Sequence, residues 1–186
     1  FDPDDLLELN FYCDTYGIDL ISFATCTAFI MECYQRGQIT REQMGGLDLR
    51  FGNSQAVLEL MHQISRGEGF GRIAGLGIRK LKKIFVEEFG ADPKLLQDIG
   101  MEVKGLEYSE YAHKESLAQQ GGFAMATKGP QHDEAWLIFM DMVNKQLPTY
   151  ADKAEALFFF PCFRLGSHSR DFASCLGMIS NPWTTD

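Results

Sequence analysis

The sequence predicts an all-α fold, an irregular array of packed helices, and three observations support this prediction. Apolar residues recur at three- and four-residue spacing in several segments, as they do along the buried face of a helix. These segments tend to begin at Asp or Asn residues that can cap a helix and to end at Gly residues that can terminate it. No strand-turn-strand pattern, internal repeat or low-complexity linker is found, and the frequent glycines favour short helices over a regular bundle.

The first two helices are predicted from the residues at their ends. Asp2 occupies a probable N-cap position and Pro3 the first helical position, and Gly17 can end this helix in a left-handed conformation. Asp19 is a natural N-cap for a second helix that continues to about Arg36. Two helices separated by only a few residues must meet at a tight corner.

The remainder of the first region, residues 1–100, is expected to hold three more helices. A third helix begins near Asn53, and a fourth covers residues 71–90, although Gly75 and Gly77 weaken its first turn. A short capped helix follows, over residues 92–100.

The second region, residues 101–186, begins with a segment that is expected to be extended or a loop, over residues 101–111. Three further helices are expected, over residues 114–126, 133–146 and 152–160. Pro161 is expected to end or kink the last of them, because proline lacks the amide donor of a helix interior.

Charge and composition exclude several classes of partner. The net charge of −9 and the single basic cluster at residues 79–83 argue against binding to nucleic acid or to anionic lipid. The most apolar stretch, residues 18–34, is interrupted by Glu32 and followed by Arg36, so no membrane span is predicted and a soluble chain is expected.

Cysteine usage indicates a reducing compartment, so we expect a cytoplasmic protein. Five cysteines are an odd number and include no C-x-x-C pair, which argues against a disulfide framework and a closed zinc site. Cys26 and Cys33 lie seven residues apart, on one helical face, and are expected to be small core residues. The chain begins at Phe1 without a methionine and ends at Asp186, and we treat it as a fragment of a longer protein.

Two carboxylates border the predicted corner. Asp14 lies in the last turn of the first helix, where the helix dipole disfavours negative charge, and Asp19 caps the second helix. Two interpretations remain open from spacing alone. Either Asp19 is only a cap and Asp14 a solvated charge, or the pair holds a ligand rich in N–H donors.

A second concentration of polar residues surrounds His132. Gly129 and Pro130 predict a turn, after which His132 precedes Asp133 and Glu134 at a helix start. The two acids can be simple capping residues and His132 a surface residue. Alternatively, His132 sits on a rigid loop where its imidazole can pass protons to a substrate.

Glycines and aromatic residues near this loop also suggest a ligand. Gly121 and Gly122 lie in a predicted helix, where close approach of a bulky ligand to the backbone is one explanation for them. Phe123, Trp136 and the aromatic residues of segment 158–163 could form a pocket for a flat ring, or could simply pack the core. No phosphate-binding loop or nucleophile elbow is present.

Taken together, these stretches resemble one family. The segment CDTYGIDLIS (13–22) resembles the D-x-x-G-[LI]-D pterin motif of the aldehyde:ferredoxin oxidoreductase family of tungsten enzymes. The segments AFIMECYQRGQIT, GGLDLRFGNSQAVLELMHQISRGEGFG and MEVKGLE are similar, in the same order, to its helical second and third domains. The run QQGG…ATKGPQHDEAW, with ALFFFPCFR and NPW, looks closer to the tungsten-containing catalytic subunit of class II benzoyl-CoA reductase.

The resemblance implies a cofactor and a set of site residues. The family binds tungsten through two pyranopterins, with a [4Fe-4S] cluster nearby, between a β-rich first domain and two helical domains. Asp14, Gly17, Ile18 and Asp19 would then hold one pterin, because a carboxylate can accept two adjacent N–H groups side by side. His132 would correspond to the active-site histidine. Tungsten and molybdenum are not distinguished by these residues.

The second pterin motif of the family, D-x-x-G-L-C, is degenerate here. Its best match is SCLGMIS (174–180), in which Gly177 and Met178 fit but Ile179 stands at the position of the cluster cysteine. Cys175 lies one helical turn earlier and is the alternative cluster ligand. The remaining cluster cysteines and the β-rich domain are absent, so the chain alone is expected to be inactive.

Three functions follow from the resemblance. The first is reduction of an aromatic acyl-CoA in anaerobic aromatic degradation, with electrons from an iron–sulfur subunit or ferredoxin and a proton from His132. The second is oxidation of aldehydes to carboxylates. The third is a non-catalytic helical module that lost its cluster, as Ile179 suggests.

Overall fold

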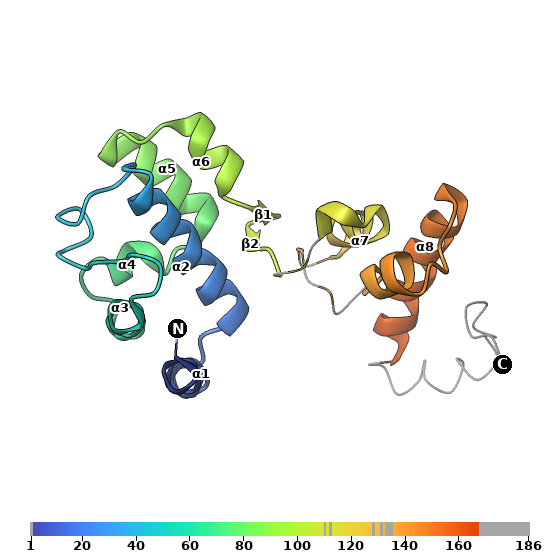
Figure 1. Cartoon of the computed structure of the whole chain (residues 1–186), viewed down its shortest axis with the longest axis horizontal. Coiled ribbons are helices and arrows are strands. Elements are labelled where there is room, and N and C mark those ends of the chain that lie inside the picture. Colours follow the sequence, from blue (N-terminus) through green and yellow to red (C-terminus); the bar gives the residue numbers. More distant parts are fainter. Residues whose placement is uncertain are drawn as a thin grey trace. The chain divides into compact units, whose positions relative to one another are not determined.

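The computed structural model describes residues 2–109, 111, 113–127, 129–130, 132 and 136–167. The chain divides into two compact units, residues 1–110 and 111–186, which are described separately (Figure 1). Helices dominate both units, so the predicted all-α class is confirmed. Within the described ranges, no single helix is both long and apolar enough to cross a membrane. Among the described helices, only Pro3–Tyr16 and Leu20–Gln35 taken together satisfy that test, and this pair is bent by 119°.

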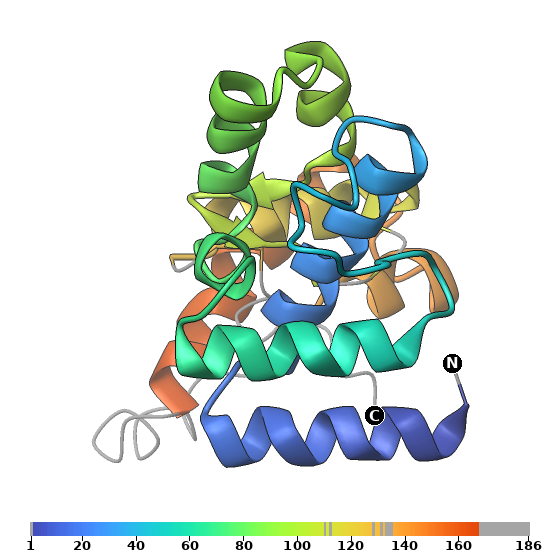
Figure 2. The ribbon, with the colours of Figure 1, turned by 90° about the vertical axis from the view of Figure 1, so that its left-hand side faces the viewer.

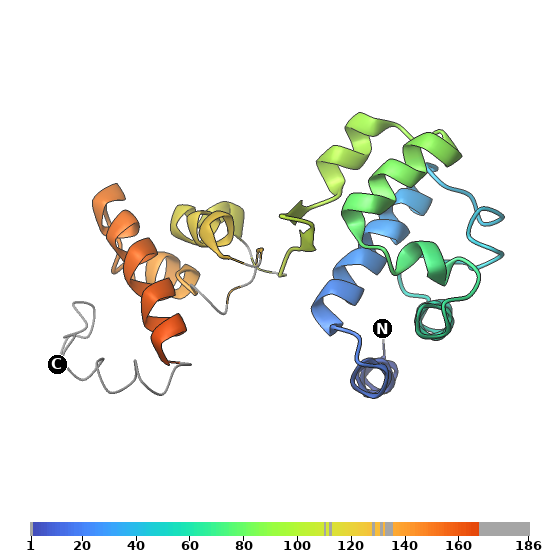
Figure 3. The ribbon, with the colours of Figure 1, turned by 180° about the vertical axis from the view of Figure 1, so that it is seen from behind.

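The first unit consists of six helices and a small hairpin. In chain order these are α1 (Pro3–Tyr16), α2 (Leu20–Gln35), α3 (Ser54–Arg66), α4 (Gly71–Ala74), α5 (Ile78–Phe89), α6 (Pro93–Ile99), β1 (Glu102–Val103) and β2 (Leu106–Glu107). α2 lies at the centre and contacts α1, α4, α6 and β2. α1 and α3 run side by side (Figure 2), and α5 packs beside α6 (Figure 3).

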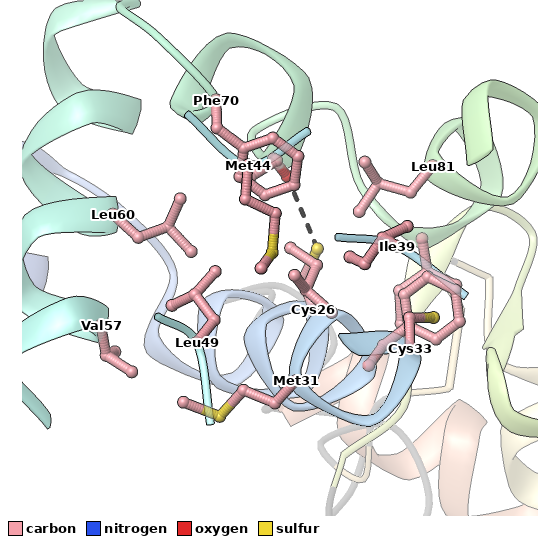
Figure 4. Close-up of a cluster of buried hydrophobic side chains, with 14 of the residues drawn as sticks. Cys26, Met31, Cys33, Ile39, Met44, Leu49, Val57, Leu60, Phe70 and Leu81 are labelled. Carbon is pink, nitrogen blue, oxygen red and sulfur yellow. Dashed lines mark hydrogen bonds between the residues drawn. The ribbon is translucent and has the colours of Figure 1, made fainter. Parts of the chain in front are cut away.

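The core of this unit gathers around α2. Seven residues of α2 are buried, including Cys26 and Cys33, so the prediction that both cysteines are core residues is confirmed (Figure 4). Their environment suppresses ionisation, because burial raises the pKa of the Cys33 thiol to about 12 and that of Cys26 further. Three phenylalanines, Phe29, Phe70 and Phe89, stack around Phe85 within this unit, with ring centroids 5.5–6.5 Å from that of Phe85. Burying each such side chain contributes about 1.5–3 kcal/mol.

The predicted ends of the first three helices are confirmed. The Asp2 carboxylate accepts a hydrogen bond from the Asp4 amide at 2.9 Å, and Asn53 accepts one from the amide of Ala56 at 3.2 Å. Asp92 caps α6 in the same way, so this short helix is also confirmed. Each cap satisfies an amide that the helix itself leaves without a partner.

Two predictions for the first unit are wrong. Residues 71–90 form two helices, α4 and α5, because Gly77 adopts a φ of +83° that a continuous helix cannot contain. A strand-turn-strand does occur at residues 102–107, where Val103 pairs with Leu106. Lys104 and Gly105 make its turn with φ of 57° and 85°, as a tight hairpin requires. Strands of two residues are too short to show the alternation by which strands are recognised.

The described part of the second unit contains fewer buried residues than the first unit. Its elements are the 3₁₀ turn η1 (His113–Glu115), α7 (Leu117–Met125), the π-helical turn η2 (Phe139–Val143) and α8 (Tyr150–Ser167). α7 packs on α8 (Figure 3), and a small cluster of buried residues joins these elements: Ala118, Leu137, Leu147 and Ala156.

Three predictions for this unit need correction. Within the described part of residues 133–146, helix is confined to the neighbourhood of η2. α8 continues through Pro161 to Ser167, so of the two predicted effects of this proline, an end or a kink, the end is wrong. The space beside Gly121 is filled by Leu157, because a Cβ atom at this position would lie 2.6 Å from Cδ1 of that residue. The glycine therefore permits α7 and α8 to pack closely.

Buried polar groups hold the second unit together. Asp141 accepts hydrogen bonds from the Ser116 hydroxyl and the Ala118 amide, and pairs with Lys153 at 2.6 Å. The Gln119 side chain accepts from two amides just before η2, at 2.8 and 3.0 Å. Side chains therefore provide a large share of the bonds that fix η2 on α7.

Candidate functional site

The corner between α1 and α2 is closed by backbone hydrogen bonds. The Gly17 amide donates to the Asp14 carbonyl at 3.3 Å, and the Ile18 amide donates to the Cys13 carbonyl at 2.9 Å. Gly17 has a φ of 67°, and a Cβ atom there would meet nothing within 4 Å. Conformation, not crowding, therefore requires glycine, and the space beside its Cα is open.

Both carboxylates of the motif lie at this corner. Asp14 is in the last turn of α1, and Asp19 caps α2 by accepting the Ser22 amide at 2.7 Å. Both side chains are exposed, and the Asp14 carboxylate makes no hydrogen bond with any residue that the structure describes. Beneath them, burial raises the pKa of the Cys13 thiol, and the charges of Asp14 and Asp19 raise it further. The two carboxylates thus act on the same buried atom, from adjacent helices.

The electrostatics of the corner favour a ligand that donates hydrogen bonds. The last turn of α1 contains no basic residue, so nothing within that turn offsets the charge of Asp14 at the negative end of the helix dipole. Asp19 uses only Oδ1 for its cap, so Oδ2 remains able to accept. N–H donors would be attracted to this corner and anions repelled.

A cavity of about 240 Å³ opens beside Asp19, between α2, the 74–77 segment and β2. Its walls are formed by Ile18, Asp19, Ser22, Phe23, Cys26, Thr27, Ile30, Ile64, Ala74, Gly75, Gly77 and Glu107. Two of the four residues predicted to hold a pterin, Ile18 and Asp19, therefore line a cavity, whereas Asp14 and Gly17 border the corner outside it.

These residues fit the amino-pyrimidine edge of a pterin. That edge presents adjacent N–H donors, and the corner presents two carboxylates and an open glycine. No group of three or more His, Cys, Asp or Glu side chains suited to a metal occurs in the described part of the chain.

The second unit places His132 beside a different cavity. This cavity measures about 330 Å³ and is lined by His132, Trp136, Phe139, Met140, Phe160 and Phe163. The His132 ring lies edge-on to Tyr111, with ring centroids 4.9 Å apart. Trp136 stacks on Phe139 at 5.9 Å. An imidazole therefore shares a cavity with four aromatic side chains.

The pocket expected for a flat ring is lined by only some of the aromatic residues that were predicted to form it. Trp136 and the Phe160 and Phe163 side chains line the cavity, but Phe123 is fully buried elsewhere and Phe158 is 70% exposed. Asp133 and Glu134 lie outside the described residues. So do Cys175, Gly177, Met178 and Ile179, the residues matched to the second pterin motif, and the structure gives no placement for them.

Sequence reasoning missed two features near the corner. The Tyr16 hydroxyl lies 2.9 Å from Nδ1 of His62, which joins the end of α1 to α3, and the Tyr12 ring packs edge-on against the same imidazole at 4.7 Å. Thr27 and Glu107 line the cavity beside Asp19. In each feature the residues that meet come from distant parts of the chain, Tyr16 with His62 and Thr27 with Glu107, and the sequence holds no local signal that would have joined them.

Comparison with known proteins points to the same family for nearly the whole chain. The family model described as aldehyde ferredoxin oxidoreductase, domains 2 and 3, matches residues 1–171. A tungsten-containing aldehyde ferredoxin oxidoreductase of Pyrococcus horikoshii is 32% identical over 144 residues, 75% of this chain. An aliphatic sulfonate oxidoreductase, WOR-like subunit, of Pyrococcus furiosus is 28% identical over 71% of this chain. The chain spans 22% and 21% of the length of these relatives.

Proposed function

Because the chain belongs to the aldehyde ferredoxin oxidoreductase family, in the part described as domains 2 and 3, we propose that it is one portion of a tungsten pterin oxidoreductase. The observation that carries this proposal is the position of the D-x-x-G-I-D motif. It forms a tight corner with two exposed carboxylates beside a cavity, and it fits a pterin edge. The pterin-bound tungsten would supply electron transfer between a substrate and a redox partner.

Each residue of the corner has a proposed task. Asp14 and Asp19 accept N–H groups of the amino-pyrimidine, and Gly17 leaves space for the ring to approach the backbone. Ile18 provides an apolar wall at the mouth of the cavity. The cap on Ser22 holds Asp19 in one orientation, so this acceptor is positioned before any ligand arrives.

For the substrate, we propose an aromatic acyl-CoA that is reduced at its ring. The cavity beside His132 supports this choice, because its aromatic walls can enclose a flat ring and exclude water. His132 lies in that wall, where it would donate the proton that accompanies electron transfer to the ring. Strongly reducing chemistry needs such exclusion of water.

A second candidate is the oxidation of aldehydes to carboxylates, which the printed names of the relatives favour. In this reaction His132 would instead accept a proton. The third candidate, a non-catalytic module, is favoured by Ile179 at the cluster-cysteine position.

Partners and location are also proposals. The rest of a parent chain would supply the β-rich domain and the other ligands of a [4Fe-4S] cluster, with Cys175 as the alternative to Ile179. An iron–sulfur subunit or ferredoxin would deliver or accept electrons, and the reducing cytoplasm would suit the unpaired thiols of Cys13, Cys26 and Cys33.

The deciding experiment uses the longer protein that carries this segment, purified without oxygen. Tungsten, molybdenum, iron and pterin are measured per polypeptide. The protein is then assayed with an aromatic acyl-CoA and a low-potential donor, with a dienoyl-CoA in reverse, and with simple aldehydes. We expect tungsten, activity on the aromatic acyl-CoA couple and poor aldehyde oxidation. Robust aldehyde oxidation alone would favour the second candidate. Absence of both metals and of pterin would favour the third candidate, the non-catalytic module.

A further inference from the structure

The cavity beside Asp19 contains two buried polar groups that the pterin motif does not include. Thr27 and Glu107 are each only 5% exposed, and both line this cavity. Thr27 lies in the middle of α2, and Glu107 ends β2, eighty residues later in the chain. They meet because β2 packs on α2.

One oxygen of the Glu107 carboxylate makes a hydrogen bond that stabilises the fold. Oε1 accepts the amide of Ile78, the first residue of α5, at 2.9 Å. A Cβ atom on Gly77 would lie 2.8 Å from this oxygen, and Gly77 also has a φ of +83°. The glycine therefore lets the carboxylate approach the start of the helix, whose dipole favours the negative charge.

The second carboxylate oxygen of Glu107 and the hydroxyl of Thr27 have no such hydrogen bond within the described fold. Neither makes a hydrogen bond or an ion pair with any residue in the described part of the chain. Buried polar groups in native proteins are nearly always hydrogen-bonded, since leaving one without a partner carries its full desolvation cost. Two such groups around one cavity indicate that something in the cavity bonds to them.

The remaining wall restricts the chemistry of that occupant. Among the described residues that line the cavity there is no lysine, arginine or histidine, and the two ionisable oxygen groups, Asp19 and Glu107, are both carboxylates. The Cys26 thiol donates to the Ala74 carbonyl at 3.5 Å, and burial raises its pKa, so it remains a thiol and adds no cation or nucleophile. A phosphate group would be repelled here, whereas a flat apolar ring with N–H donors would fit.

We propose that this cavity receives part of the N–H edge of the pterin's amino-pyrimidine, with Oε2 of Glu107 and the Thr27 hydroxyl as acceptors behind Asp19, while Asp14 accepts the rest of that edge at the corner outside the cavity. The inference rests on the proposed pterin function and extends it to two residues outside the motif. Glu107 has two roles, because one oxygen fixes α5 and the other contacts the ring. Waters that bridge the two groups are the competing explanation.

Two substitutions separate binding from folding. In Glu107→Gln, the amide oxygen can still accept from Ile78, but its NH₂ group replaces an acceptor with a donor that opposes the N–H edge. Thr27→Val keeps the shape of the side chain and removes only the hydroxyl. Glu102→Gln is the matched control, because Glu102 is the cross-strand neighbour of Glu107 on the same hairpin and does not line this cavity.

The measurements are tungsten and pterin per polypeptide in the anaerobically purified longer protein, together with thermal unfolding of cofactor-free protein. We expect content to fall about tenfold or more in Glu107→Gln and about threefold in Thr27→Val, as expected for a lost charged and a lost neutral acceptor. Glu102→Gln should retain its content. Cofactor-free Thr27→Val should unfold no lower than the parent protein, because the substitution removes an unpartnered hydroxyl.

The outcomes distinguish this inference from the function on which it rests. If Asp14→Asn loses cofactor but Thr27→Val and Glu107→Gln retain it, the cavity holds water only and the inference fails while the function stands. If the parent protein contains no pterin, both fail. If Glu107→Gln does not fold, Thr27→Val alone decides.

Discussion

Replacing Asp14 by Asn should stabilise the cofactor-free protein and weaken its hold on the cofactor. Asp14 is exposed in the last turn of α1, and its carboxylate caps no helix and makes no hydrogen bond with a described residue. Its charge faces the negative end of the helix dipole, which is unfavourable for folding. A carboxylate kept at such a position is best explained by a ligand.

The two effects have opposite signs and can be estimated separately. Removing the charge should raise the free energy of unfolding by about 0.3–1 kcal/mol, the usual size of a dipole interaction near a helix end. Losing a charged acceptor should cost about 1.5–3 kcal/mol of cofactor binding, or roughly 10- to 150-fold in affinity. Asp19→Ala is a weaker test, because it also removes the cap on Ser22, worth about 1 kcal/mol.

The assay combines denaturant unfolding of cofactor-free protein with tungsten and pterin content of the loaded protein. Asp4→Asn is the matched control, since Asp4 is an exposed aspartate in the first turn of the same helix. There the dipole favours the charge, so the control should lose stability and keep its cofactor. Unchanged tungsten and pterin in folded Asp14→Asn would refute the assignment of this carboxylate.

Three further outcomes follow from single side chains. His132→Asn should retain tungsten and lose about 10²–10⁴-fold in turnover, and parental turnover would make His132 a simple loop residue. Gly90→Ala should lower the free energy of unfolding by about 1–2 kcal/mol, because alanine is strained in a left-handed backbone. Gly77→Ala should lower it more, because the added Cβ atom would also crowd Glu107, and unfolding curves can test both. Burial raises the pKa of Asp141, but bonds from Lys153, Ser116 and the Ala118 amide outweigh this and lower it. The stability that Asp141 contributes should therefore be present above about pH 4 and be lost as the pH falls further, with a shallower loss in Asp141→Asn.

Local signals explain why the first unit was largely predictable. Asp2, Asp19 and Asn53 act within three residues of their own positions, so a cap can be read directly from the sequence. The same holds for Gly17, whose left-handed conformation depends on the helix end beside it.

Features that depend on distant partners were not predictable. Gly77 allows α5 to start where it does because Glu107, thirty residues later in the chain, accepts the Ile78 amide at that point. Gly121 suggested a ligand, but its neighbour is Leu157 on another helix. The cavity beside Asp19 draws its walls from four separate segments, and no single stretch of sequence indicates it. The spacing of residues in the sequence predicts the corner between α1 and α2, whereas the cavity beside Asp19 depends on the tertiary packing of distant segments.

The two helices that form the corner are anchored unequally, and this leads to a final prediction. α2 buries seven residues, whereas α1 buries only Leu9 and Cys13 and leaves Leu6, Leu7 and Phe11 exposed. In cofactor-free protein, amides of α1 should therefore exchange with solvent faster than those of α2.

A ligand held by both Asp14 and Asp19 adds free energy to the docking of α1, because local opening of α1 would break its bond to Asp14. Loading with cofactor should thus reduce the difference between the amide exchange rates of α1 and α2, as hydrogen–deuterium exchange can measure. This reduction should disappear in Asp14→Asn and persist in Asp4→Asn. If α1 exchanges equally fast in protein that demonstrably contains pterin, Asp14 does not contact the cofactor, and Asp19 alone would connect the corner to its ligand.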